Sequence, residues 1–336
     1  MVSIKHIAQV SGYSVATVSR YLNDGYVSKK AAQAIEQAIK DYDYKPNYVA
    51  RNLVTKKSNT IGLLIPSLNN PFLTDFVEGV EETSSKYGYN IFLCHSRDDI
   101  ETEKRYLKLL LERRVDGIII FPVTAYNPIY SEISNSIPML SVIRKIEHAK
   151  ISSIIVDDYN GSYQIVEHLI KKGHRNIAFI NGLQNISTGK ERWRGAQAAA
   201  KHYGIQIKYD WVGFTKYSVQ SSYLETLKLL KKGTLPTAVC AASQLLALGA
   251  LKAIKELKLN IPDDISLIAF DGLDSTYSEN FIEPRITANK NQYKEMGEIA
   301  IDMILNEMNE KKTKHEHPKD IIINLTIEER DSIKNI

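Results

Sequence analysis

Residues 4–23 read IKHIAQVSGYSVATVSRYLN and predict two short helices joined by a tight turn. Apolar side chains recur there at helical spacing, and Ser3 and Ser14 each stand where an N-cap is expected. Gly12 lies between the two patterns and tolerates the positive φ that ends many helices. A third helical pattern follows over residues 29–42. Together they predict a three-helix, helix-turn-helix head whose second helix fits the major groove of DNA.

The second helix carries side chains at its start that an ordinary three-helix bundle does not require. Val15 and Ala16 can touch thymine methyl groups or shape base contacts. Thr17 and Ser19 can donate hydrogen bonds to phosphates, and Arg20 can donate two to a guanine edge. The pattern therefore favours DNA binding over a generic helical bundle.

The basic excess of the chain sits in its first 58 residues. They hold nine Lys and Arg against four Asp and Glu, an excess of +5, whereas the whole chain carries +4. A basic N-terminal segment followed by a nearly neutral remainder is expected of a protein that binds a polyanion through that segment. The charge distribution alone is equally consistent with a basic surface that is simply exposed to solvent.

From Thr60 onward the chain alternates short apolar runs with helical patterns, which is typical of parallel α/β sheets. The predicted strands are 61–65, 91–94, 117–121, 139–142, 154–156, 177–180, 238–241, 265–270 and 320–325. The predicted helices are 72–87, 101–113, 160–172, 191–203, 220–232, 244–257 and 292–310. Roughly 270 residues are too many for one small sheet. We therefore expect a two-lobed α/β body with parallel sheets over residues 60–332, with a ligand outside the carboxyl ends of the strands.

Composition and the absence of known motifs restrict the location and the class of function that we expect. No apolar run approaches the roughly 18 residues of a membrane helix, and residues 1–10 are too polar for a signal peptide, so a cytoplasmic protein without membrane contact is expected. Cys94 and Cys240 lie in apolar runs and are expected to be buried thiols. The sequence holds no Gly-x-x-x-x-Gly-Lys loop, Gly-x-Ser-x-Gly elbow, His-Glu-x-x-His motif or spaced cysteine pair. We expect a protein that is not an enzyme and that uses no cofactor and no metal.

Several stretches of the chain match one known family almost residue by residue. In the head they are Ile4–Ala8, Gly12–Ser14, Thr17–Arg20, Leu22–Asn23 and Tyr44–Leu53. In the body they are Lys172–Ile180, Glu191–Gly195, Pro262–Asp271 and the closing stretch Glu329–Ser332. These stretches resemble the LacI/GalR family of bacterial transcription regulators, over nearly the whole chain. The resemblance implies a helix-turn-helix head over residues 1–45 and a body like that of periplasmic sugar-binding proteins. The Val15-Ala16 pair resembles the galactose-repressor branch, and His6 departs from the family's usual Asp.

The resemblance also implies that residues 46–59 form a hinge helix and linker. A helix of about eight residues is not stable alone in water, so it should form only where two copies pack together on DNA. Leu53 would then wedge between base pairs in the minor groove and bend the duplex. Because no heptad helix for tetramers follows the closing stretch, a homodimer on a pseudo-palindromic, double-stranded operator is expected. The expected DNA contacts are Ser3, Ser14, Val15, Ala16, Thr17, Ser19, Arg20, Asn23, Asn47, Ala50 and Leu53.

The same resemblance implies an effector site for a small sugar or sugar phosphate. Its expected residues are Phe72, Arg144, Thr188, Arg192, Tyr217, Ser243, Asp271 and Tyr293. The chain departs from the family at two places: it has Ser243-Gln244 where Asn-Asp is frequent, and Ile143-Arg144 where Asp-Arg is frequent. Fewer carboxylates mean fewer acceptors for sugar hydroxyl groups. One hypothesis is therefore a phosphorylated or less conventional saccharide, with Arg144 as the partner of the anion.

The expected function is that of a DNA-binding repressor of a carbohydrate-utilisation operon whose operator affinity changes when the effector binds. Release of the operator by an inducer is the favoured sign of this response, and effector-promoted binding stays open. Two alternatives also stay open: a sugar-binding protein without a role on DNA, and a regulator controlled by a partner protein.

Overall fold

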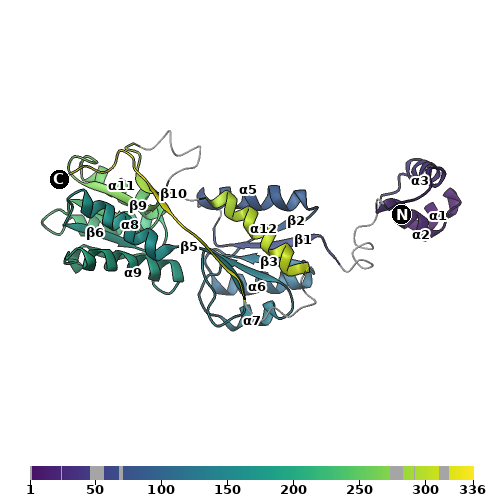
Figure 1. Cartoon of the computed structure of the whole chain (residues 1–336), viewed down its shortest axis with the longest axis horizontal. Helices are drawn as coiled ribbons and strands as arrows, with labels where there is room; N and C mark the ends of the chain where they lie inside the picture. Colours follow the sequence, from purple (N-terminus) through teal and green to yellow (C-terminus); the bar gives the residue numbers. More distant parts are fainter. Residues whose placement is uncertain are drawn as a thin grey trace. The chain divides into compact units, whose positions relative to one another are not determined.

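The computed structural model describes residues 2–23, 25–45, 57–67, 71–272, 283–290, 292–309 and 318–336, with the backbone alone for Pro71 and Phe72. It divides into two compact units, Met1–Ser58, the head, and Asn59–Ile336, the body (Figure 1). The hinge residues Asn47, Ala50 and Leu53, predicted to contact DNA, lie outside the described residues.

The head contains α1 (Ile4–Ser11), α2 (Val15–Leu22) and α3 (Lys29–Asp41) around one small core. A serine hydroxyl caps each helix by accepting a backbone N–H: Ser3 from His6 at 3.3 Å, Ser14 from Thr17 at 3.1 Å and Ser28 from Ala31 at 3.3 Å. Gly12 ends α1 with a φ of 75°. The predicted all-α helix-turn-helix head is confirmed.

Lobe 1 of the body is built on a parallel sheet with the strand order β11-β5-β4-β3-β1-β2. Its strands are β1 (Thr60–Ile65), β2 (Asn90–His95), β3 (Gly117–Ile120), β4 (Met139–Val142), β5 (Ser152–Val156) and β11 (Asp320–Ile323). Helices α5 (Pro71–Lys86) and α12 (Tyr293–Asn309) lie side by side on one face, while α6 (Ile100–Glu112) and α7 (Pro128–Ser134) cover the other (Figure 1). Strand side chains alternate between these faces: Leu63 packs in the core with α5, and Leu64 in the core with α6.

Lobe 2 contains the sheet β12-β10-β9-β8-β6-β7, which is parallel except where β12 pairs antiparallel with β10. Its strands are β6 (Ile177–Asn181), β7 (Val212–Phe214), β8 (Ala238–Ala241), β9 (Ser266–Asp271), β10 (Thr287–Lys290) and β12 (Thr326–Glu328). Helices α8 (Asp158–Lys171) and α9 (Ser187–His202) pack on one face. Helices α10 (Val219–Leu230) and α11 (Gln244–Glu256) pack on the other, and the short 3-10 helix η1 (Tyr209–Trp211) precedes β7.

Within the described ranges the chain passes between the lobes three times: from β5 to α8, from β10 to α12 and from β11 to β12. Helix α12 therefore starts at the junction of the lobes and belongs to lobe 1, although it follows most of lobe 2 in the sequence. These passages bring residues far apart in the sequence to the carboxyl ends of both sheets.

The structure confirms the predicted body of two parallel-sheet α/β lobes, and most predicted elements agree within a few residues at each end. The sequence prediction missed α7, β7, β10 and β12, which have three to seven residues each. Cys94 and Cys240 are buried and free, and burial raises the pKa of their thiols to about 11 and about 12. In the described part of the chain, no helix combines the length and the apolar character needed to cross a bilayer.

Candidate functional site

A cavity of about 320 Å³ lies where the carboxyl ends of the strands of both lobes meet. Seven of the eight predicted effector residues line it: Arg144, Thr188, Arg192, Tyr217, Ser243, Asp271 and Tyr293. The eighth is Phe72, whose side chain lies outside the described part of the structure. Leu73, Phe121 and Ile143 of lobe 1 add an apolar wall. The cavity thus offers both polar groups and an apolar surface to a small ligand.

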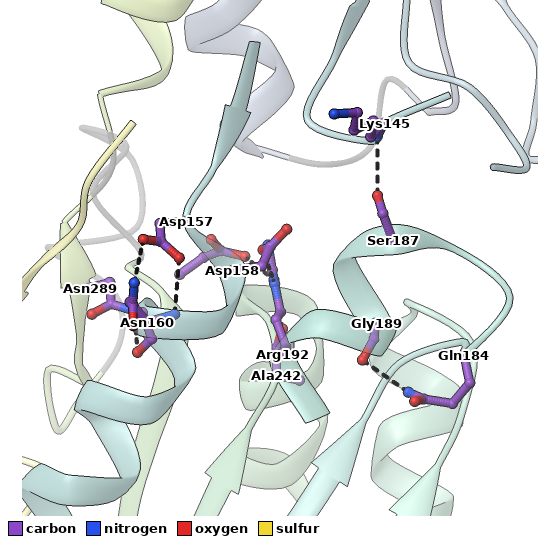
Figure 2. A network of polar contacts seen from close by, with 12 residues as sticks. Lys145, Asp157, Asp158, Asn160, Gln184, Ser187, Gly189, Arg192, Ala242 and Asn289 are labelled. Atoms are coloured by element: carbon purple, nitrogen blue, oxygen red, sulfur yellow. Dashed lines mark hydrogen bonds and ion pairs between the residues drawn. The ribbon is translucent and has the colours of Figure 1, made fainter. Parts of the chain in front are cut away.

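Arg192 is the centre of a buried polar network in lobe 2 (Figure 2). Its side chain is almost inaccessible and comes from the second turn of α9. The Nε atom donates to Oδ1 of Asp158 at 2.7 Å, and Nη1 donates to the carbonyl oxygen of Ala242 at 2.7 Å and to Oδ2 of Asp271 at 3.1 Å. The guanidinium carbon also lies 3.6 Å from the ring centroid of Phe270. These contacts fix the guanidinium in one orientation.

Burial sets the electrostatics of this network. Removal from water raises the pKa of Asp158 to about 6, although the neighbouring Arg192 acts to lower it. Burial disfavours the charged form of Arg192 as well, but Asp271 and Asp158 together hold the pKa of the guanidinium above its ordinary value. The cation and its carboxylates therefore stabilise each other in a site that is largely shielded from solvent.

Hydrogen bonds at the cavity join the lobes. The Tyr293 hydroxyl, at the start of α12 in lobe 1, donates to Oδ1 of Asp271 in lobe 2 at 2.8 Å. The backbone N–H of Lys145 in lobe 1 donates to Oγ of Ser187 in lobe 2 at 3.1 Å (Figure 2). A ligand that competes for Asp271 or separates these groups would change how the lobes pack against each other.

The side chain of Tyr217 packs closely against two glycines of lobe 2, Gly182 and Gly189. A Cβ atom at Gly182 would lie 2.0 Å from Cζ of the Tyr217 ring, and one at Gly189 would lie 3.4 Å from its hydroxyl. Burial raises the pKa of this hydroxyl. It makes no hydrogen bond among the described residues, although the Thr188 side chain lies close enough to favour its ionised form. A buried hydroxyl of this kind is a ready donor for a ligand in the cavity.

Replacing Gly182 with alanine is expected to push the Tyr217 ring out of its place. Overpacking of this size costs about 1–3 kcal/mol of unfolding free energy, and effector binding should weaken with it. Urea unfolding measures the cost, with Asn185→Ala, an exposed position in the same loop, as the control. An unchanged midpoint in Gly182→Ala would mean that the ring moves aside freely.

Arg144 already has partners within the cavity wall. Its side chain is 13% exposed, and its Nη1 donates to Oδ1 of Asp98 and to the carbonyl oxygen of Pro122, both at 3.1 Å. Sequence reasoning missed Asp98. This residue follows β2 with a φ of 51° and supplies a carboxylate to the cavity where Ile143 replaces the family's frequent Asp.

The start of α2 presents the predicted DNA-reading residues on the surface of the head. Ser14, Val15, Ala16, Arg20 and Asn23 are exposed, with 40% of the Val15 surface accessible. Thr17 and Ser19 are half-buried, and Ser3 is exposed beside α1. Two of these residues, Ser14 and Asn23, also make hydrogen bonds that stabilise α2.

Ser14 both caps α2 and lies 2.9 Å from the Thr17 hydroxyl, and the Asn23 amide donates to the Ser19 carbonyl at 2.7 Å. Gly25, which sequence reasoning missed, lies against Arg20: a Cβ atom there would be 2.6 Å from Cγ of Arg20. A side chain at position 25 would therefore redirect the arginine.

Sequence reasoning also missed Asp158 and Phe270, which hold Arg192. A signal existed for Asp158, because Asp157-Asp158 directly follows an apolar strand and so stands at the carboxyl end of a parallel sheet. Ser243 lines the cavity, and its hydroxyl also caps α11 by accepting the Leu246 N–H at 3.3 Å.

A reading head on a three-helix core, joined in one chain to a two-lobed α/β body with a polar cavity, defines a ligand-responsive DNA-binding regulator. Residues 3–47 match the family described as bacterial regulatory proteins, lacI family. Residues 58–333 match the periplasmic binding proteins and sugar binding domain of the LacI family. The chain belongs to the LacI family of DNA-binding transcription regulators.

Similar proteins span the same length. The transcriptional regulator RegA of Clostridium saccharobutylicum is 34% identical over 313 residues, which cover 92% of this chain and 93% of RegA. The repressor PurR of Pectobacterium carotovorum is 32% identical over 337 residues, which cover 99% and 97%. The structure of the lac repressor dimer bound to operator and the anti-inducer ONPF has a TM-score of 0.87 at 27% identity, with 99% of each chain covered.

Proposed function

We propose that the chain is a homodimeric repressor that acts on chromosomal DNA in the cytoplasm and releases a pseudo-palindromic operator when a neutral, hydroxyl-rich effector enters the cavity. The relatives are transcription regulators, which supports a regulatory rather than an enzymatic role. The exposed face at the start of α2 supports base reading by Val15, Ala16 and Arg20. The expected contacts of Asn47, Ala50 and Leu53 with DNA belong to the same proposal.

We choose a neutral effector because each arginine that lines the cavity already forms an ion pair with one or two carboxylates. Arg192 is paired with Asp158 and Asp271, and Arg144 with Asp98. A phosphate would have to displace a carboxylate from one of these arginines, whereas a sugar hydroxyl can accept from the guanidinium and donate to the carboxylate without separating the pair. The apolar wall of Leu73, Phe121 and Ile143 suits the less polar face of a sugar ring.

Matched pairs of ligands test this proposal. D-ribose, D-galactose and cellobiose are each compared with their phosphate monoesters, first by thermal shift and then by calorimetry. We expect a neutral member to bind at least about tenfold more tightly than its phosphate, a difference of about 1.4 kcal/mol, and to lower operator affinity in a gel shift. Tighter binding of a phosphate that is lost in Arg144→Ala would instead establish Arg144 as the anion partner.

A further inference from the structure

Glu103 is a fully buried acid that the effector site does not use directly. It lies in the first turn of α6, and its side chain has no exposed surface. Its Oε2 accepts the backbone N–H of Val123 at 2.9 Å, and its Oε1 accepts the hydroxyl of Tyr130 from α7. No cation forms an ion pair with it among the residues that the structure describes. A buried carboxylate held by two neutral donors is unusual enough to need an explanation.

The groups tied to Glu103 belong to one wall of the effector cavity. Val123 follows Phe121, which lines the cavity, and Pro122, whose carbonyl holds Arg144. Asp98, the other partner of Arg144, stands directly before the N-cap of α6, the helix that carries Glu103. The loop that holds Arg144 is fastened to the same segment, because the Glu147 N–H donates to the Ala125 carbonyl at 2.7 Å.

We propose that Glu103 is a positioning residue that sets the Asp98–Arg144 wall of the effector cavity, and that the gain or loss of its proton changes that wall. This proposal rests on the proposed function only for the use of the cavity. The carboxylate is a stronger acceptor than the neutral acid, so loss of the proton tightens the bond from Val123 and draws the 121–125 segment toward α6. Negative charge on Glu103 also attracts Arg144 and repels Asp98.

The proton is exchanged in the range of cellular pH. Burial raises the pKa of Glu103 to about 7, against the Tyr130 hydroxyl, the Val123 N–H and Arg144, which lower it, while Asp98 raises it further. Tyr130, Arg144 and Asp98 are the ionisable groups that act on this carboxyl. By linkage, a ligand that binds one protonation state more tightly also shifts the pKa of Glu103.

Hydrogen–deuterium exchange of the full chain without ligand, between pH 5.5 and 8.5, tests the proposal. After correction for the intrinsic pH dependence of exchange, the amides of residues 121, 123–126 and 145–148 should gain about fivefold protection with a common midpoint near pH 7. Glu103→Gln should flatten both profiles. Glu101→Gln, whose side chain is 74% exposed in the same helix turn, should leave them as in the unchanged chain.

A second variant guards against simple misfolding of Glu103→Gln. Tyr130→Phe keeps the acid but removes a donor that lowers its pKa, so the midpoint should move to higher pH. A flat profile in the unchanged chain, or an unchanged midpoint in Glu103→Gln, would overturn the proposal. Because no ligand is present, these outcomes are independent of whether a sugar binds, and failure of the ligand pairs to bind would count only against the proposed function.

Discussion

Replacing Arg192 with alanine is expected to lower the unfolding free energy of the body by about 3–5 kcal/mol and to abolish its response to effector. The substitution leaves Asp158 and Asp271 buried without their cation, and it removes the donor to the Ala242 carbonyl. Loss of one partner from a buried pair is far costlier than loss of the pair, because the remaining charge keeps its desolvation penalty. Urea unfolding at pH 7.5 measures the loss.

Arg194→Ala is the matched control for this change. Arg194 lies in the same helix and its side chain is 58% exposed. It forms an ion pair with Glu191 three residues away, and its guanidinium carbon lies 5.6 Å from the centroid of the Tyr159 ring. A pair of this kind contributes about 0–1 kcal/mol. Equal effects of the two substitutions would contradict a buried network at Arg192.

The defect of Arg192→Ala should depend on pH in a defined direction. Asp158 already has a pKa of about 6 in the folded chain, above the value of about 3.9 for an unperturbed aspartate. A group whose pKa is raised by folding stabilises the folded state below its unfolded pKa, and this contribution is lost as the pH rises through the folded pKa. Removal of Arg192 raises the pKa of Asp158 further, so the variant should be least impaired near pH 5 and most impaired above pH 7. Denaturation midpoints across this range show the trend.

Replacing Arg20 with lysine is expected to weaken binding to the operator while sparing non-specific DNA binding. The guanidinium can make two parallel hydrogen bonds to one guanine, whereas the ammonium group is a point charge without this geometry. Each half-site should lose about 1–3 kcal/mol, and a dimer reads two half-sites. Fluorescence anisotropy at one fixed salt concentration measures the loss on a palindrome selected in vitro with the full chain and on a scrambled duplex.

Arg20→Met is the companion variant, since it removes the charge and keeps much of the side chain's length. It should weaken binding to both duplexes, whereas Arg20→Lys should change mainly the ratio between them. A parallel loss on both duplexes in Arg20→Lys would identify Arg20 as a phosphate contact instead of a base-reading residue.

The sequence predicts local structure well where one residue determines the backbone. Ser3, Ser14 and Gly12 are in the capping positions that the pattern predicts, because capping depends only on neighbours within one turn. Long buried strands and helices were found for the same reason: their periodicity records which side chains face a core. Of the short strands, β3 and β8 were found because they are continuous apolar runs, whereas β7 is only three residues long and β10 is mostly polar, so neither stands out in the sequence.

The cavity was predicted only in part, because pairing between distant residues leaves no local pattern. The resemblance to the LacI/GalR family supplied Arg192, Asp271 and Tyr217, and the cavity contains them. Neither the pattern nor the resemblance paired Arg192 with Asp158, which is 34 positions away, or Arg144 with Asp98. These pairs depend on which strands become neighbours in the sheets, and Glu103 depends on a core contact with α7, a helix that the pattern missed.

The repeated passage of the chain between the lobes has a consequence for synthesis on the ribosome. Strand β11 completes the sheet of lobe 1, and β12 completes that of lobe 2, only after residues 320 and 326 have been made. Tyr293 likewise joins Asp271 only once α12 has emerged. A nascent chain can therefore form the head early, but it cannot assemble a ligand-competent cavity until the distant residues up to position 328 have been made.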